Sequence, residues 1–156
     1  EKEGFEYMKG LHKNINQYTK SGSAPIKAAA RGENIIGIVF IHDAVKQAVK
    51  GFPIKSVAPC EGTGYEIGSM SLIKGGRNLD EAKKFYDWAL TAETQSRALE
   101  VNAFQVPSNI GAKVSPKAPK LEDIKLIKYD FVKYGSSAER KRLLKKWDNE
   151  VKSLPK

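Results

Sequence analysis

Three short groups of polar residues in this sequence have the types and spacing that suit ligand binding. They are Ser21-Gly22-Ser23, His42-Asp43 and Tyr65-Glu66. Hydroxyl and backbone N–H groups donate hydrogen bonds to anions, and a carboxylate can accept hydrogen bonds from two sugar hydroxyls. A histidine with two carboxylates also suits a hard metal ion. The residue types therefore indicate a site for a small polyhydroxylated anion or for a metal ion.

The serine turn at 21–23 comes immediately before a predicted helix that begins near Pro25. Proline is tolerated in a first helical turn, where its missing N–H would be unpaired anyway. Two hydroxyls, free N–H groups and the positive end of a helix dipole would together form an anion site. Serine is also a common helix N-cap, so the residues alone leave both interpretations open.

His42 and Asp43 follow the continuous apolar run IIGIVFI at 35–41, which is rich in β-branched residues. Such a run predicts a parallel strand that is buried on both faces. In open α/β sheets, ligands bind beyond the carboxyl ends of the strands, where these two residues would lie. The alternatives are a helix N-cap for Asp43 and a packing histidine for His42.

Tyr65 and Glu66 lie among the glycines of EGTGYEIG, within the stretch 59–91. Glycine permits positive φ and close backbone approach, so two large side chains between glycines suit the wall of a cavity. A short strand at 70–73 follows, and a capping-box pattern then starts a helix at Asn78.

Apolar spacing and capping residues predict the remaining elements. Further helices are expected over 4–15, from Pro25 to Gly32, from Asp43 to Gly51, from Thr91, and from Ser136 to the end, with another strand at 53–59. His12 is expected at the surface or half-buried, Trp147 in the core, and Phe104, Val106 and Ile110 of the loop 102–120 to need burial.

The composition is basic, with 27 Lys and Arg against 18 Asp and Glu and a formal net charge of +9. The lysines are spread along helix faces and mixed with acids, and no helix-turn-helix, zinc-finger or RNA-binding motif accompanies them. This pattern favours a solvated surface over a nucleic-acid-binding module, and a positive field also favours an anionic ligand.

Several motifs are missing from the sequence. It has no nucleophile elbow, metal motif or cofactor loop, so we expect neither an enzyme nor a cofactor. It has no apolar run of about 18 residues that could span a membrane. The single cysteine, Cys60, is expected to be a small, partly buried residue without a disulfide.

The ordered stretch PCEGTGYEIGSMSLIKGGRNLDEAKKFYDWALT at 59–91 resembles the solute-binding proteins of ABC importers, in the branch called ferric-iron type. In that family an EGTGYE strand crosses between two lobes and precedes a KG-x-x-N loop and a helix of the pattern EAAKKFxDWxLS. The resemblance implies an α/β fold: a type II periplasmic-binding-protein lobe with a mixed, mostly parallel sheet and flanking helices, plus the segment that returns to the other lobe.

The same resemblance implies that the chain is the C-terminal half of such a protein. Residues 1–64 would belong to the second lobe, 65–125 to the hinge strand and the segment returning to the first lobe, and 126–156 to a helical segment packing back on the second lobe. The first lobe would be absent from this chain. We then expect a periplasmic or extracytoplasmic location, with any lipid anchor upstream of Glu1, and self-association through exposed apolar surface.

By resemblance, two lobes close around a small anionic ligand and present it to an ABC permease. The ligand-binding residues implied are Ser21, Gly22, Ser23, His42, Asp43, Tyr65 and Glu66, with Gln105 and Asn109 as minor candidates near the cleft. The ligand expected is a sugar phosphate. The alternative is ferric iron with an anion, held by Tyr65, His42 and Glu66, although Gly64 leaves no vicinal tyrosine pair of the kind that the iron-binding members use.

Overall fold

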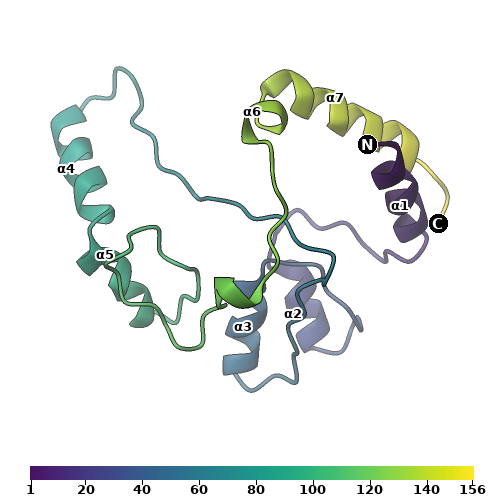
Figure 1. Ribbon diagram of the computed structural model, residues 1–156, viewed down its shortest axis with the longest axis horizontal. Coiled ribbons are helices and arrows are strands. Elements are labelled where there is room, and N and C mark those ends of the chain that lie inside the picture. Colours follow the sequence, from purple (N-terminus) through teal and green to yellow (C-terminus); the bar gives the residue numbers. More distant parts are fainter. The chain divides into compact units, whose positions relative to one another are not determined.

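The computed structural model describes residues 1–156, which divide into two compact units (Figure 1). One unit combines the two ends of the chain, Glu1–Lys20 and Lys128–Lys156, and the other is Ser21–Ile127. The helices are α1 (Lys2–His12), α2 (Ala24–Ala30), α3 (Ile41–Val49), α4 (Leu79–Ala89), α5 (Ala92–Ser96), α6 (Phe131–Tyr134) and α7 (Ser137–Trp147), with helical turns η1 (Arg97–Leu99), η2 (Leu121–Asp123) and η3 (Asp148–Lys152). None of these helices has the length and apolar character needed to cross a bilayer.

The unit of the two chain ends is built from α1, α6, α7 and η3, and α1 packs against η3, which continues α7. Its buried apolar residues are Phe5 and Val151, and full burial of such a side chain stabilises a fold by about 1.5–3 kcal/mol. The Lys146 ammonium lies over the Phe5 ring, 4.4 Å from its centroid. Ser136 caps α7 by accepting a hydrogen bond from the Glu139 N–H, as the capping pattern predicts.

His12 is buried, so the prediction of a surface or half-buried histidine is wrong. Its Nε2 lies 3.0 Å from the Leu154 carbonyl oxygen and its Nδ1 2.9 Å from the Tyr18 hydroxyl. Because a carbonyl oxygen only accepts, Nε2 donates to the Leu154 carbonyl, and in the neutral imidazole Nδ1 then accepts from the Tyr18 hydroxyl. Tyr18 also meets the half-buried Trp147 edge to face. Burial is possible because both ring nitrogens have partners.

In the second unit, α2 and α3 pack side by side (Figure 1). Ile26 of α2 and Ala44 of α3 are buried. The predicted glycine ends are confirmed, because Gly32 has φ +76 and Gly51 has φ +89, values that favour glycine.

The central helix α4 begins at Leu79, as the sequence predicts, but the expected capping box is absent. Asn78 is the N-cap residue, yet its side chain makes no hydrogen bond to the helix. Thr91 does cap α5, since its hydroxyl accepts a hydrogen bond of 3.2 Å from the Thr94 N–H.

The predicted strands at 35–41, 53–59 and 70–73 are not paired in a sheet in this structure. Ile41 already belongs to α3, and the pairing that is present is an isolated parallel bridge between Thr63 and Leu126. A strand is stable only when its N–H and carbonyl groups bond to a neighbour. Within residues 21–127, such a neighbour is available at Thr63 alone.

Candidate functional site

The serine turn leads directly into α2, but it does not cap this helix. Ser23 occupies the N-cap position without a side-chain hydrogen bond to the helix. Its hydroxyl oxygen lies 3.4 Å from that of Ser21, and the Ala24 N–H donates to the Ser21 carbonyl. With seven residues, α2 is short, so hydroxyl groups rather than a helix dipole would contribute most to recognition of an anion.

His42 and Asp43 lie in the first turn of α3, and Asp43 does not cap the helix either. The N-cap residue is Phe40, whose carbonyl oxygen accepts a hydrogen bond of 3.0 Å from the Asp43 N–H. His42 Nε2 and Asp43 Oδ2 are 4.0 Å apart, and both side chains are half-buried. At this distance the two polar groups are close but not hydrogen-bonded to each other, so both keep capacity for a ligand.

Phe40 connects this pair to the serine turn. The Phe40 and His42 rings are stacked, with centroids 5.6 Å apart and planes 12° apart. A Cβ placed on Gly22 would lie 3.7 Å from the edge of the Phe40 ring, so the ring rests on the backbone of the turn. Phe40 therefore lies beside both Gly22 of the serine turn and the His42 ring.

Sequence reasoning missed Phe40. The signal that could have identified it is its position: it is an aromatic residue near the end of an apolar run, two residues before His42. The approach of the two segments is also close at Gly37, where a Cβ would lie 2.9 Å from the Pro25 carbonyl oxygen. Only a residue without a side chain allows the run to pass the start of α2 at this distance.

Tyr65 and Glu66 follow Thr63, whose backbone is hydrogen-bonded to the segment at 125–127. The Thr63 N–H donates to the Lys125 carbonyl at 2.9 Å, and the Ile127 N–H donates to the Thr63 carbonyl at 3.0 Å. Both side chains are exposed. These contacts run to the returning segment at 125–127, so placing Tyr65 and Glu66 in one site with the serine turn remains a prediction.

The two loop candidates, Asn109 and Gln105, have different surroundings in the structure. The Asn109 side-chain N–H donates to the Leu90 carbonyl at 2.8 Å, and its side-chain oxygen accepts from the Gly111 N–H at 2.9 Å. Its amide is therefore used to hold the loop. Gln105 is exposed. Among the apolar loop residues, Phe104 is buried as expected, whereas Val106 and Ile110 are exposed, contrary to the prediction.

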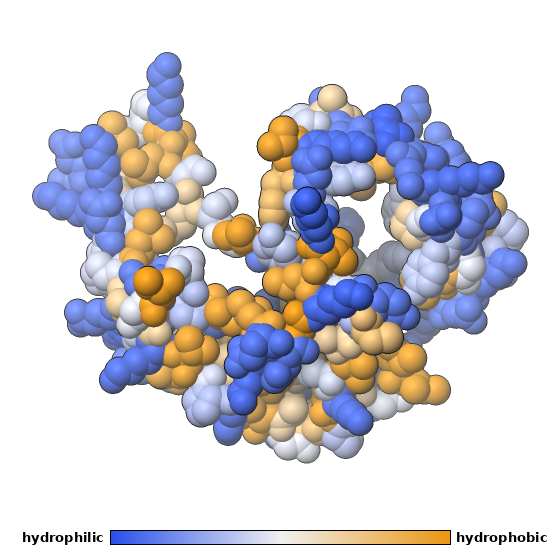
Figure 2. Space-filling model, in the orientation of Figure 1, coloured by the Kyte–Doolittle hydropathy of each residue, from blue (hydrophilic) through white to orange (hydrophobic).

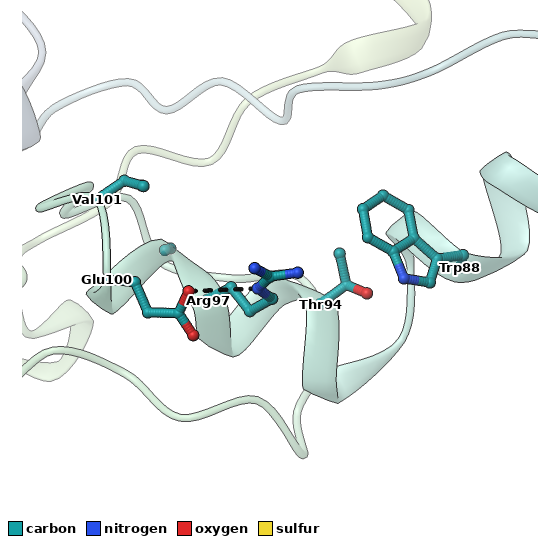
Figure 3. Close-up of a pocket in the computed structure, with 6 residues that line it drawn as sticks. Trp88, Thr94, Arg97, Glu100 and Val101 are labelled. Carbon is teal, nitrogen blue, oxygen red and sulfur yellow. Dashed lines mark hydrogen bonds and ion pairs between the residues drawn. The ribbon is translucent and has the colours of Figure 1, made fainter.

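A pocket of about 320 Å³ lies elsewhere, between the end of α4 and η1 (Figure 3). Its lining residues are Trp88, Thr94, Arg97, Ala98, Glu100 and Val101. The Arg97 guanidinium is paired with Glu100 at 3.3 Å, as the dashed line in Figure 3 shows. Because the Glu100 carboxylate neutralises the Arg97 guanidinium, this open pocket offers little to an anion.

The structure contains no group of three or more His, Cys, Asp and Glu side chains that could hold a metal ion. Cys60 is exposed rather than partly buried, and its thiol donates to the Glu61 carboxylate. The backbone N–H of Glu61 and this thiol lower the pKa of the Glu61 carboxyl.

Comparison with known sequences gives two matches. The profile of a family described as bacterial extracellular solute-binding protein matches residues 1–125. An uncharacterized protein of Haemophilus influenzae (strain Rd) is 49% identical over 153 residues, which are 97% of this chain and 44% of that protein.

Comparison with solved structures gives two similar proteins. The periplasmic binding protein AfuA from Actinobacillus pleuropneumoniae, solved with exogenous fructose-6-phosphate bound, has a TM-score of 0.93 and 51% identity, covering 98% of this chain and 48% of that one. The periplasmic binding protein P5PA has a TM-score of 0.87 and 39% identity, covering 96% and 48%. The chain thus spans about half the length of the proteins it matches, and its fold is that of part of a periplasmic binding protein.

Proposed function

We propose, for a chain that belongs to the family of bacterial extracellular solute-binding proteins, a part in capturing a sugar phosphate for an ABC importer. The observation that carries the ligand class is the contact of Phe40 with both Gly22 and His42. Through this ring, the hydroxyl donors of the serine turn would lie near a carboxylate and an imidazole that bind sugar hydroxyls. The similarity to AfuA, solved with fructose-6-phosphate, supports the same class.

The residues divide the work by their chemistry. Ser21 and Ser23 donate hydrogen bonds to phosphate oxygens, and the missing side chain of Gly22 lets the ligand approach the backbone. Asp43 accepts from sugar hydroxyls, and His42 both donates and accepts through its two nitrogens. Tyr65 and Glu66 complete the set from the strand that crosses between lobes.

The proposal extends to the architecture of the complete protein. Segments 35–40, 53–59 and 70–73 would be strands of a mixed, mostly parallel sheet. Residues 1–64 would belong to the second lobe, 65–125 to the hinge and the segment returning to the first lobe, and 126–156 to a helical segment on the second lobe. Closure of two lobes around the ligand creates the form that an ABC permease recognises.

The proposed function is binding without turnover, in an extracytoplasmic location. In this location, a lipid anchor upstream of Glu1 would attach the protein to the membrane. In such a protein, the histidine and carboxylate groups near the ligand serve as hydrogen-bond partners rather than as an acid–base pair.

Titration of this chain with fructose 6-phosphate, followed by NMR of its backbone amides, tests the proposal. One lobe alone binds weakly, and NMR detects weak binding residue by residue. We expect shifts at residues 21–23 and 42–43, larger than those caused by fructose or inorganic phosphate alone. Ser23→Ala should weaken binding by about 10-fold, because a hydrogen bond to a charged group contributes about 1.5–3 kcal/mol.

Ser137→Ala provides the matched control, since Ser137 is an exposed serine in the first turn of α7. It should leave the titration unchanged. Equal loss in both variants, or shifts only at residues outside the serine turn and α3, would contradict the proposed site. Visible iron–phenolate absorption on addition of ferric ion, with no response to the sugar phosphate, would favour an iron-binding protein instead.

A further inference from the structure

The positive charge of the chain is concentrated in the unit of the two chain ends. Residues 1–20 and 128–156 contain 13 Lys and Arg against 7 Asp and Glu, so they carry +6 of the net charge of +9. The excess is greatest on α7, where five of eleven residues are Lys or Arg and only Glu139 is acidic. In Figure 2, hydrophilic residues, in blue, gather over this unit, where Figure 1 places α1 and α7. A field concentrated on one helix favours an anionic partner.

The cations of α7 fall into two sets, and acids neutralise the first of them. Arg142 pairs with Glu1 and, at 2.7 Å, with Glu139. Lys146 pairs with Glu1 at 2.8 Å. The acids near α7 are therefore engaged on the side of the helix that meets the start of α1, and they leave its other cations unneutralised.

The second set is Arg140, Lys141 and Lys145, which we call the α7 cation face. Residues one, four and five positions apart lie on the same side of an α-helix. All three side chains are exposed, and none of them makes an ion pair or a side-chain hydrogen bond. Leu144 lies on the same side, four residues after Arg140, and is 46% exposed. A basic helix face with an exposed apolar residue is typical of helices that lie on a membrane surface.

The geometry of the α7 cation face favours a lipid surface over other anions. A face on a single helix has no walls to enclose a small anion. Two of its three cations are lysines, which are flexible point charges that impose little geometry on a partner. The family is extracellular, and the similar AfuA and P5PA are periplasmic, so a nucleic acid is a poor fit. Anionic headgroups spread over a bilayer attract Lys and Arg near the surface without any defined pairing.

We propose that Arg140, Lys141 and Lys145 of α7 form a docking face for an anionic lipid bilayer. The three cations lie among the lipid headgroups, and Leu144 enters the boundary between headgroups and acyl chains. This contact would hold the protein close to the membrane in addition to its part in solute capture. The inference rests on the extracytoplasmic location in the proposed function and does not depend on the sugar phosphate.

Co-sedimentation of this chain with vesicles tests the proposal. One set of vesicles contains equal parts of phosphatidylglycerol and phosphatidylcholine, and the other contains phosphatidylcholine alone. We expect binding to the anionic vesicles that weakens as salt is added, because salt screens the attraction between exposed charges. Equal binding to the neutral vesicles would overturn the proposal, and so would absence of binding to the anionic vesicles at low salt.

Replacement of the α7 cation face should remove most of this binding. The combined variant Arg140→Gln, Lys141→Gln and Lys145→Gln should weaken it at least about 10-fold, since each cation near an anionic bilayer contributes about 5-fold. The control removes the same charge from exposed lysines within residues 21–127 and should have a much smaller effect. Its substitutions are Lys50→Gln, Lys55→Gln and Lys113→Gln. Equal weakening by the two variants would overturn the proposal.

An acidic protein is the other partner that the α7 cation face could bind, and soluble poly-glutamate is the probe for it. Binding of poly-glutamate that is lost with the α7 substitutions, without binding to either set of vesicles, would overturn the lipid assignment in favour of an acidic protein. No sugar phosphate is present in these assays. Their failure would therefore leave the NMR titration, and the ligand assignment that it tests, unaffected.

Discussion

The ring of Phe40 lies nearly parallel to the imidazole of His42, with centroids 5.6 Å apart, and its edge lies 3.7 Å from the position that a Cβ on Gly22 would occupy. One aromatic residue thereby lies next to both the serine turn and the His42 imidazole. Stacked aromatic pairs contribute about 0.5–1.5 kcal/mol beyond the area they bury. Phe40 is therefore a positioning residue in the candidate site.

Replacement of Phe40 by alanine should loosen both groups at once. We expect Phe40→Ala to weaken fructose 6-phosphate binding by about 10-fold, the upper end of what loss of a stacked pair allows. The measurement is the NMR titration, with the ring shifts of His42 as a second readout. Phe40→Tyr keeps the ring and should preserve both; if Phe40→Tyr is as impaired as Phe40→Ala, the stacking explanation fails.

Two glycines near the site should respond differently to alanine. A Cβ on Gly37 would lie 2.9 Å from the Pro25 carbonyl oxygen, whereas one on Gly22 would make an ordinary contact of 3.7 Å with Phe40. We expect Gly37→Ala to lower the free energy of unfolding by about 1–3 kcal/mol, as overpacking does. Gly22→Ala should change it by less than about 0.5 kcal/mol. Urea unfolding measures the stability of both variants. Equal stability would show that the segment at Gly37 and the start of α2 move apart freely.

His12 joins α1 to the end of the chain through the Leu154 carbonyl and the Tyr18 hydroxyl. His12→Leu should remove both hydrogen bonds from a buried ring position, and each lost bond costs about 0.5–1.5 kcal/mol. Tyr18→Phe removes one of the two bonds and should cost less. Thermal unfolding of the unmodified chain and the two variants gives their order of stability. A Tyr18→Phe variant less stable than the His12→Leu variant would contradict the prediction.

The first residue of the chain should confer acid-sensitive stability. Hydrogen bonds from Arg142 and then Lys146 lower the pKa of Glu1 from 4.5 to about 2. A lowered carboxyl pKa stabilises the folded state above pH 4.5, and this contribution is lost as pH falls toward 2. Arg142→Gln should therefore flatten the dependence of unfolding on pH within that window. Arg140→Gln, on the same helix, is the control and should leave the slope unchanged.

In isolation the chain should self-associate through its exposed extended segments. Each copy carries a net charge of +9, so added salt should strengthen association by screening repulsion. Sedimentation across protein and salt concentrations measures this. A monomer at all concentrations would contradict the expectation, and weakening by salt would indicate that ion pairs rather than apolar contacts hold the copies together.

Helices could be predicted from the sequence because their signals are local. The periodic apolar residues, the caps at Thr91 and Ser136 and the glycine end at Gly51 lie within or next to the elements they define. Strands depend on partners far along the chain, and the run at 35–41 has none within its own unit. Its apolar character was therefore informative about burial in a complete protein, but not about pairing in this chain.

The candidate site, like the fold, was predictable from the sequence only in part. Residue types near predicted strand and helix ends identified Ser21, Ser23, His42 and Asp43 as candidates, and the structure places the His42 ring and Gly22 beside Phe40. Phe40 itself was hidden within an apolar run. Asn109 illustrates the opposite error, since an amide that looks suited to a ligand is used to hold a loop.

The packing of α1 against η3 also constrains when α1 can fold during synthesis of the chain. Residues 1–20 leave the ribosome before residues 21–127, and their packing partners at 128–156 are synthesised only after that segment. Until Leu154 emerges, His12 and Phe5 must wait in contact with water or with a chaperone while residues 21–127 are produced between them. Truncation of only the final few residues should consequently disturb the first helix, the part of the chain farthest from the cut in sequence.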